Sequence, residues 1–136
     1  MSRLPLWTQS PLDIVTARYY AGSAFHNATM RTHQQIDQRS LAMHRLIAAK
    51  IRRDRALFEK AKATLARWRD NVSGHSQPYL EEWERLMNQN MEACLGVAVQ
   101  DTEWAAAMRQ CSPFAGALTN RERFAFLRTW NRDHAT

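Results

Sequence analysis

Basic side chains are concentrated between Leu41 and Asp70 of this 136-residue chain. They are Arg45, Lys50, Arg52, Arg53, Arg55, Lys60, Lys62, Arg67 and Arg69, and the acidic residues among them are Asp54, Glu59 and Asp70. Cationic side chains at this density pair with phosphates or with the carboxylates of another protein. We therefore expect these nine side chains to contact a partner protein or, as an alternative, nucleic acid.

Histidines and one carboxylate form the first candidate metal site. His26, His33, Asp37 and His44 follow one another at spacings of seven, four and seven residues. Imidazole and carboxylate groups are good zinc or iron ligands, but seven residues span about 10.5 Å along a helix. Only His33 and Asp37 would be close enough to share one ion. We expect polar surface here, with no metal and no cofactor.

Catalytic patterns are weak in this sequence. Cys94 and Cys111 have no histidine near them in the chain, and no nucleophile elbow or cysteine-protease signature occurs. The acidic run from Glu81 to Glu84 fits a helix start better than an acid/base pair. All four glycines are isolated, so there is no phosphate-binding loop. We expect a non-enzymatic protein with no catalytic residue, and a small enzyme is the least favoured of the three classes.

The net charge of +6 is divided unevenly along the chain. Residues 1–70 hold thirteen Lys or Arg and five Asp or Glu, whereas residues 71–136 hold six and eight. This asymmetry favours a basic interaction surface on the first half. The competing interpretation is a solvated helix surface that binds nothing.

Composition and periodicity predict one all-α domain, a bundle of five to six helices spanning residues 1–136. The apolar fraction is 45%, with only four Gly and four Pro. Residues 30–72 are expected to form a basic antiparallel helical hairpin that turns at Asp54. Its inward stripes contain Met43, Ile47 and Ile51 in the first helix and Phe58, Ala61, Leu65, Trp68 and Val72 in the second. Because no Gly or Pro separates the two stripes, one long helix is the alternative.

The rest of the chain is expected to flank this hairpin. Residues 1–10 would form an extended arm, and residues 78–133 the C-terminal helices. Their starts are predicted at Pro78, Asn90 and Asp101 and at the Thr119–Glu122 capping box. The inward residues expected there are Tyr79, Trp83, Leu86, Met87, Trp104, either Ala107 or Met108, Cys111, Phe124, Leu127 and Trp130.

Aromatic residues are abundant, with five Trp and five Phe. Most should be core, but Trp7 and Trp130 are the candidates for hydrophobic anchors in a partner or homodimer contact. No run of eighteen apolar residues and no signal peptide is visible. We expect a cytoplasmic protein with two reduced cysteines and no membrane contact.

Direct reading of a DNA groove is not favoured, because a helix-turn-helix needs a turn of about three or four residues. The connection from Cys111 to Thr119 is too long, and the turn at 53–55 lacks the usual glycine. Nucleic-acid binding through phosphate contacts remains the alternative to partner-protein binding.

Two segments resemble a known group of proteins. They run from Leu46 through Ala56 to Trp68 and from Ser112 to Arg123. Over roughly residues 41–130 the chain is similar to small, mostly uncharacterised helical bacterial proteins, some in cassettes that resemble toxin–antitoxin modules. Arg55 stands where that group tends to have proline. The resemblance implies a regulatory or antitoxin-like protein, with a toxin as one candidate for its partner, and assigns no site residue.

Overall fold

The computed structural model describes residues 32–71 and 74–135. Within these ranges the chain forms helices and no strand, which confirms the expected single-domain all-α class. The predicted arm of residues 1–10, which contains Trp7, lies outside the described residues, and so do His26 and Val72.

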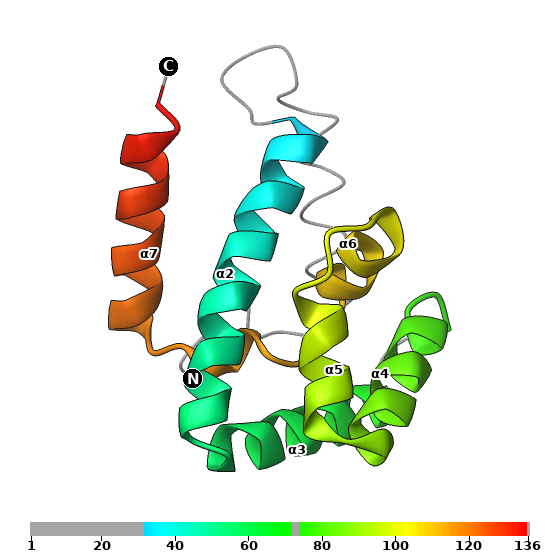
Figure 1. Cartoon of the computed structure of the whole chain (residues 1–136). Helices are drawn as coiled ribbons and strands as arrows, with labels where there is room; N and C mark the ends of the chain where they lie inside the picture. The colour runs from blue at the N-terminus through cyan, green and yellow to red at the C-terminus, as the bar shows by residue number, and fades with distance from the viewer. Residues whose placement is uncertain (1–31, 72–73, 136) are drawn as a thin grey trace.

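The described helices follow one another with short connections (Figure 1). They are α2 His33–Arg53, α3 Ala56–Asn71, α4 Gln77–Gln89, α5 Met91–Ala98, α6 Glu103–Gln110, the 3₁₀ turn η2 Ala115–Ala117, and α7 Asn120–Asp133. Side-chain caps fix several starts: Thr32, Asn90, Thr102 and Thr119 each accept a hydrogen bond from a backbone N–H of the first turn.

Asp54 separates α2 from α3, so residues 33–71 form two helices rather than the single long helix that was the alternative. Its backbone is extended, with φ −142° and ψ 91°, and its N–H donates to the carbonyls of Lys50 and Ile51. Its side-chain Oδ1 then accepts the N–H of Ala56 at 3.2 Å. One residue therefore ends the first helix and helps to start the second, so the predicted break is confirmed without a glycine or proline.

The expected antiparallel arrangement of these two helices is not observed. Figure 1 shows α3 running across the foot of α2, and α3 packs mainly against α4. The buried stripe of α3 (Phe58, Ala61, Leu65 and Trp68) is the predicted one. Heptad spacing identifies which face is buried but not which helix covers it, and here α4 and η2 cover α3 while α5 and α6 pack on α2.

Trp83 lies at the centre of the core, fully buried beside Phe114. Its ring meets Phe114 edge to face with centroids 5.5 Å apart, and its indole Nε1 donates to the carbonyl of Met108 at 3.0 Å. Phe114 also stacks on Phe58 at 6.4 Å. One tryptophan therefore joins α4, α6 and the loop before η2.

Cys94 and Cys111 are both buried and free, as predicted. Burial raises the pKa of the Cys94 thiol to about 12. A thiol in this state carries almost no nucleophilic thiolate near neutral pH. Both cysteines therefore act as small apolar core residues.

In α4 and α6, the prediction that two aromatic residues belong to the core is wrong. Trp104 is 45% exposed and Tyr79 is 37% exposed. In α6 the N-cap is Thr102 rather than the predicted Asp101, and Ala105 and Met108 are the residues that face inward. In α4 the neighbouring Leu80 is buried instead of Tyr79. At both places the smaller of two adjacent apolar residues is the buried one, while the other predicted inward residues of these helices, Trp83, Leu86, Met87 and Met108, are buried.

The last helix, α7, begins with the predicted Thr119–Glu122 capping box. No residue of α7 is fully buried, and Phe124, expected to point inward, is 59% exposed. Trp130 is half-buried and stacks between Phe126 and His134 on its own helix. No helix within residues 32–71 and 74–135 combines the length and the apolar character needed to cross a membrane.

Candidate functional site

A groove of about 420 Å³ lies between α3 and the chain from Pro113 to Asn120. We call it the α3 groove. It is lined by Lys50, Leu57, Lys60, Thr64, Arg67, Trp68, Pro113, Ala115, Gly116, Ala117, Leu118, Thr119 and Asn120. This lining contains three cationic side chains and no Asp or Glu. The groove can therefore attract an anionic group over a partly apolar floor.

Helical spacing brings two of these cations to the same wall. Leu57, Lys60, Thr64 and Arg67 follow at steps of three, four and three, which places them along one face of α3. Lys60 and Arg67 are exposed. Within the part of the chain that the structure describes, neither side chain has an ion pair or a hydrogen bond. Their charges are therefore available to a ligand.

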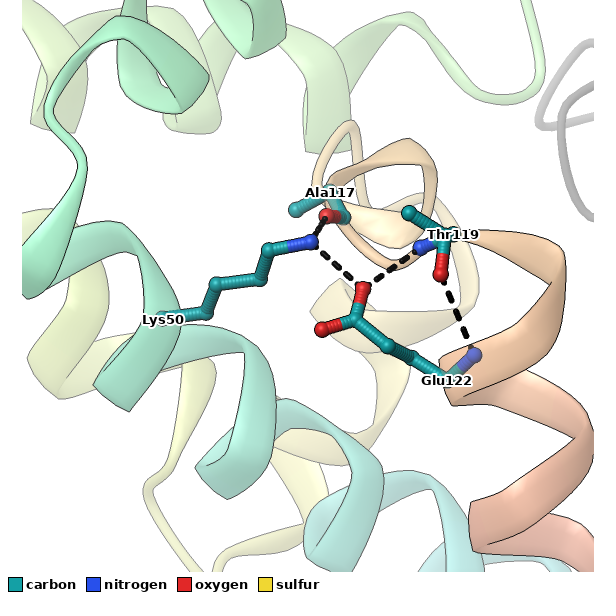
Figure 2. Close-up of polar contacts among 4 residues, drawn as sticks. All are labelled: Lys50, Ala117, Thr119 and Glu122. Atoms are coloured by element: carbon teal, nitrogen blue, oxygen red, sulfur yellow. Dashed lines mark hydrogen bonds and ion pairs between the residues drawn. The ribbon is translucent and has the colours of Figure 1, made fainter.

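Lys50, the third cation, is already neutralised by its own chain (Figure 2). Its Nζ donates to Glu122 Oε1 at 2.5 Å and to the carbonyl of Ala117 at 2.8 Å. Glu122 Oε1 also accepts the backbone N–H of Thr119 at 2.8 Å. Lys50 and the Thr119 hydrogen bonds lower the pKa of Glu122 to about 2. Lys50, predicted to contact a partner, instead ties α2 to η2 and to the first turn of α7.

We expect Lys50→Met to loosen this attachment. The change keeps most of the side-chain volume but leaves the Ala117 carbonyl and the Glu122 carboxylate without their cationic donor. Because the Glu122 side chain is 41% exposed and retains access to water, the expected loss in the free energy of unfolding is only about 1 kcal/mol. Urea denaturation measures that loss, and NMR titration should show the pKa of Glu122 moving up towards its ordinary value.

Arg128→Met is the control for Lys50→Met, since Arg128 is an exposed residue of α7 that does not line the groove. It should leave both the unfolding free energy and the Glu122 titration unchanged. An unchanged Glu122 titration in Lys50→Met would contradict the assigned contact.

His44 and Ser112 form a buried polar contact that the sequence did not predict. His44 was expected on a polar surface, which is wrong, since it is only 5% exposed. Its Nδ1 lies 2.8 Å from the carbonyl of Ser40 and its Nε2 lies 2.8 Å from Ser112 Oγ. A carbonyl only accepts, so Nδ1 carries the proton and the Ser112 hydroxyl donates to Nε2. Ser112 Oγ in turn accepts the N–H of Phe114 at 3.1 Å.

A histidine beside a serine hydroxyl is also the pairing found in nucleophilic enzymes. Here Ser112 is 2% exposed, neither residue lines the α3 groove, and the orienting group on Nδ1 is a carbonyl rather than a carboxylate. Burial lowers the pKa of His44 to about 4. The pair therefore fixes the segment beginning at Ser112 onto α2, and this segment forms one wall of the α3 groove.

The other basic residues predicted to contact a partner fall into two groups, those without and those with an ion pair or hydrogen bond among the residues that the structure describes. Arg45, Arg53 and Arg55 are exposed. The remaining side chains have partners: Arg52 pairs with Glu92 at 3.0 Å, Lys62 with Glu59 at 3.4 Å, and Arg69 donates to the carbonyl of Gln77 at 3.5 Å. Exposed pairs of this kind exchange readily with other anions. Lys60 and Arg67 are the two members of the set that combine an unpaired charge with a place in the groove.

Metal-ligating residues do not gather anywhere within residues 32–71 and 74–135. His33 and Asp37 lie on α2, while His44 is held by Ser40 and Ser112. Trp130, the second predicted anchor, is half-buried and belongs to the Phe126–His134 stack, away from the α3 groove.

The fold and the groove together define an all-α protein with a basic, partly apolar groove. Comparisons of the chain with protein-family models, with curated proteins and with solved structures found no match.

Proposed function

We propose that this chain is a non-enzymatic, cytoplasmic bacterial regulatory or antitoxin-like protein that binds an acidic partner protein through its basic helical surface. The observation that carries the proposal is the presence of unpaired cations on α2 and α3, two of them in a groove whose lining has no carboxylate. Complementary charge steers association and orients the partner, while apolar contacts supply affinity.

Apolar lining favours a protein ligand over nucleic acid. Beside Lys60 and Arg67 the groove is lined by Leu57, which is partly exposed, and by Pro113 and Leu118, which are largely buried. A phosphate backbone would use the cations but gain little from aliphatic side chains. A protein segment uses both kinds of contact.

The test is direct binding of defined probes at physiological salt. We expect a fluorescein-labelled peptide of alternating Leu and Glu pairs to bind more tightly than a labelled DNA or RNA duplex. The triple variant Arg53→Glu, Lys60→Glu, Arg67→Glu should weaken peptide binding by about tenfold or more, because each lost attraction is replaced by repulsion. Its melting temperature should stay close to that of the unmodified protein, since these side chains have no partner in the described fold.

A matched control reverses three charges elsewhere, at Arg85, Arg128 and Arg132 on α4 and α7. All three are exposed, and the net charge changes by the same amount as in the first variant. Equal loss of binding in both variants would mean that only net charge matters and would overturn the proposal. Tighter binding of the duplex, with affinity falling steeply as salt rises, would establish nucleic-acid binding in its place.

A further inference from the structure

We propose that the α3 groove is a docking site for a helical segment of the partner that carries two carboxylates about two turns apart with an apolar side chain between them. The inference rests on the proposed function and names the partner chemistry and the place where it binds. Lys60 and Arg67 would receive the carboxylates, and the apolar side chain would enter between them.

The chain's own Lys50–Glu122 contact shows which chemistry the groove accepts. At one end of the groove, a carboxylate sits against the ammonium group of Lys50 and also accepts a backbone N–H (Figure 2). At the α3 wall, Lys60 and Arg67 lack such a partner among the described residues. Glu122 neutralises only Lys50, one of the three cations that line the groove. The carboxylates of a ligand would therefore neutralise the other two, Lys60 and Arg67.

The spacing of the two cations sets the spacing in the ligand. Lys60 and Arg67 are seven residues apart on one helix, which corresponds to about 10.5 Å along its axis. A partner helix lying along α3 would match this separation with carboxylates that are themselves seven residues apart. Carboxylates on adjacent residues would reach only one of the two cations.

The size of the groove and its apolar lining favour an apolar side chain between the two carboxylates of the partner. Its volume of about 420 Å³ accommodates a few side chains rather than a folded domain. Leu57, Pro113 and Leu118 line it, and the Trp68 side chain closes part of the inner face with only 7% of its surface exposed. Burying a leucine of the partner against this floor contributes favourable transfer free energy that an entirely polar ligand would not provide.

The experiment compares two labelled peptides on the full chain by fluorescence anisotropy. Both are helical peptides of the same composition containing a central Leu and two Glu. In the first the two Glu are seven residues apart on the face of the Leu, and in the second they occupy adjacent positions. We expect the first peptide to bind about tenfold more tightly, because only it can form both ion pairs while burying the Leu.

Two matched double variants locate the site. Lys60→Glu with Arg67→Glu should remove the preference for the first peptide, while Arg128→Glu with Arg132→Glu on α7 should retain it. All four side chains are exposed, and both pairs change the net charge equally. A leucine-to-alanine version of the first peptide should lose affinity for the unmodified protein as well.

The outcomes separate the docking site from the proposed function. If the peptides bind the unmodified protein and the Lys60 and Arg67 variant equally tightly, partner binding stands and the α3 groove is overturned as its site. If both peptides bind equally well, the two-carboxylate spacing is overturned. If neither peptide binds while a nucleic-acid duplex does, both proposals fail together.

Discussion

Replacing Trp83 with alanine is expected to lower the free energy of unfolding by about 4 kcal/mol, the largest effect of any substitution considered for this protein. The side chain is fully buried, and its ring contacts Phe114 while its Nε1 donates to the Met108 carbonyl. Alanine would leave a cavity in the core and would remove one of the two hydrogen bonds that the Met108 carbonyl accepts, since the backbone N–H of Cys111 still donates to it. Chemical denaturation followed by circular dichroism measures the loss.

Trp104→Ala is the matched control for Trp83→Ala. The same atoms are removed, but Trp104 is 45% exposed, so the expected loss is below about 1 kcal/mol. If Trp83→Ala leaves no folded protein to titrate, Trp83→Phe supplies a smaller change at the same position. Equal losses at positions 83 and 104 would contradict the assigned burial of the two tryptophans.

Acidification is expected to destabilise the fold through His44. Burial, with a smaller contribution from the charge of Arg109, lowers the pKa of His44 from 6.5 to about 4. The unfolded chain therefore binds this proton at a higher pH than the folded chain does. The stability that the neutral His44 contributes is fully present above about pH 6.5. It is lost as the pH falls towards 4, by roughly 3 kcal/mol in total.

Between pH 7 and pH 5, protonation of His44 should lower the free energy of unfolding by about 2 kcal/mol. We expect the unfolding free energy of the unmodified protein to fall by that amount, and that of His44→Gln to change much less. The other histidines are common to both proteins, so the difference in slope reports His44. NMR titration of the ring provides a second readout, and a His44 ring that titrates at its ordinary pKa would refute the assignment.

Helix boundaries were the part of the fold most open to prediction, because caps act within three or four residues. The Thr119–Glu122 capping box and the start at Asn90 are where the sequence placed them. The end of one helix at Asp54 is equally local, since its N–H and its carboxylate both bond to residues within four positions. The capping box of Thr32 and Gln35 is visible in the sequence as well but was missed.

Buried faces could be predicted, but the elements that cover them could not. Phe58, Ala61, Leu65 and Trp68 are buried as their spacing indicates. The spacing is the same whether the covering helix is α2 or α4, so it gave the wrong arrangement for the hairpin. Where two large apolar residues are adjacent, as at Tyr79 and Leu80, only the direction of the neighbouring helices decides which one faces inward.

The sequence by itself determined the all-α class, most of the residues on the buried faces of the helices, and the concentration of positive charge between Leu41 and Asp70. Only the tertiary structure decided which of those charges stay free. Lys50 meets Glu122 across 72 positions of the chain, Arg52 meets Glu92 across 40, and His44 meets Ser112 across 68. No local pattern encodes such pairs, because they depend on how helices pack; the same packing leaves Lys60 and Arg67 unpaired in the α3 groove.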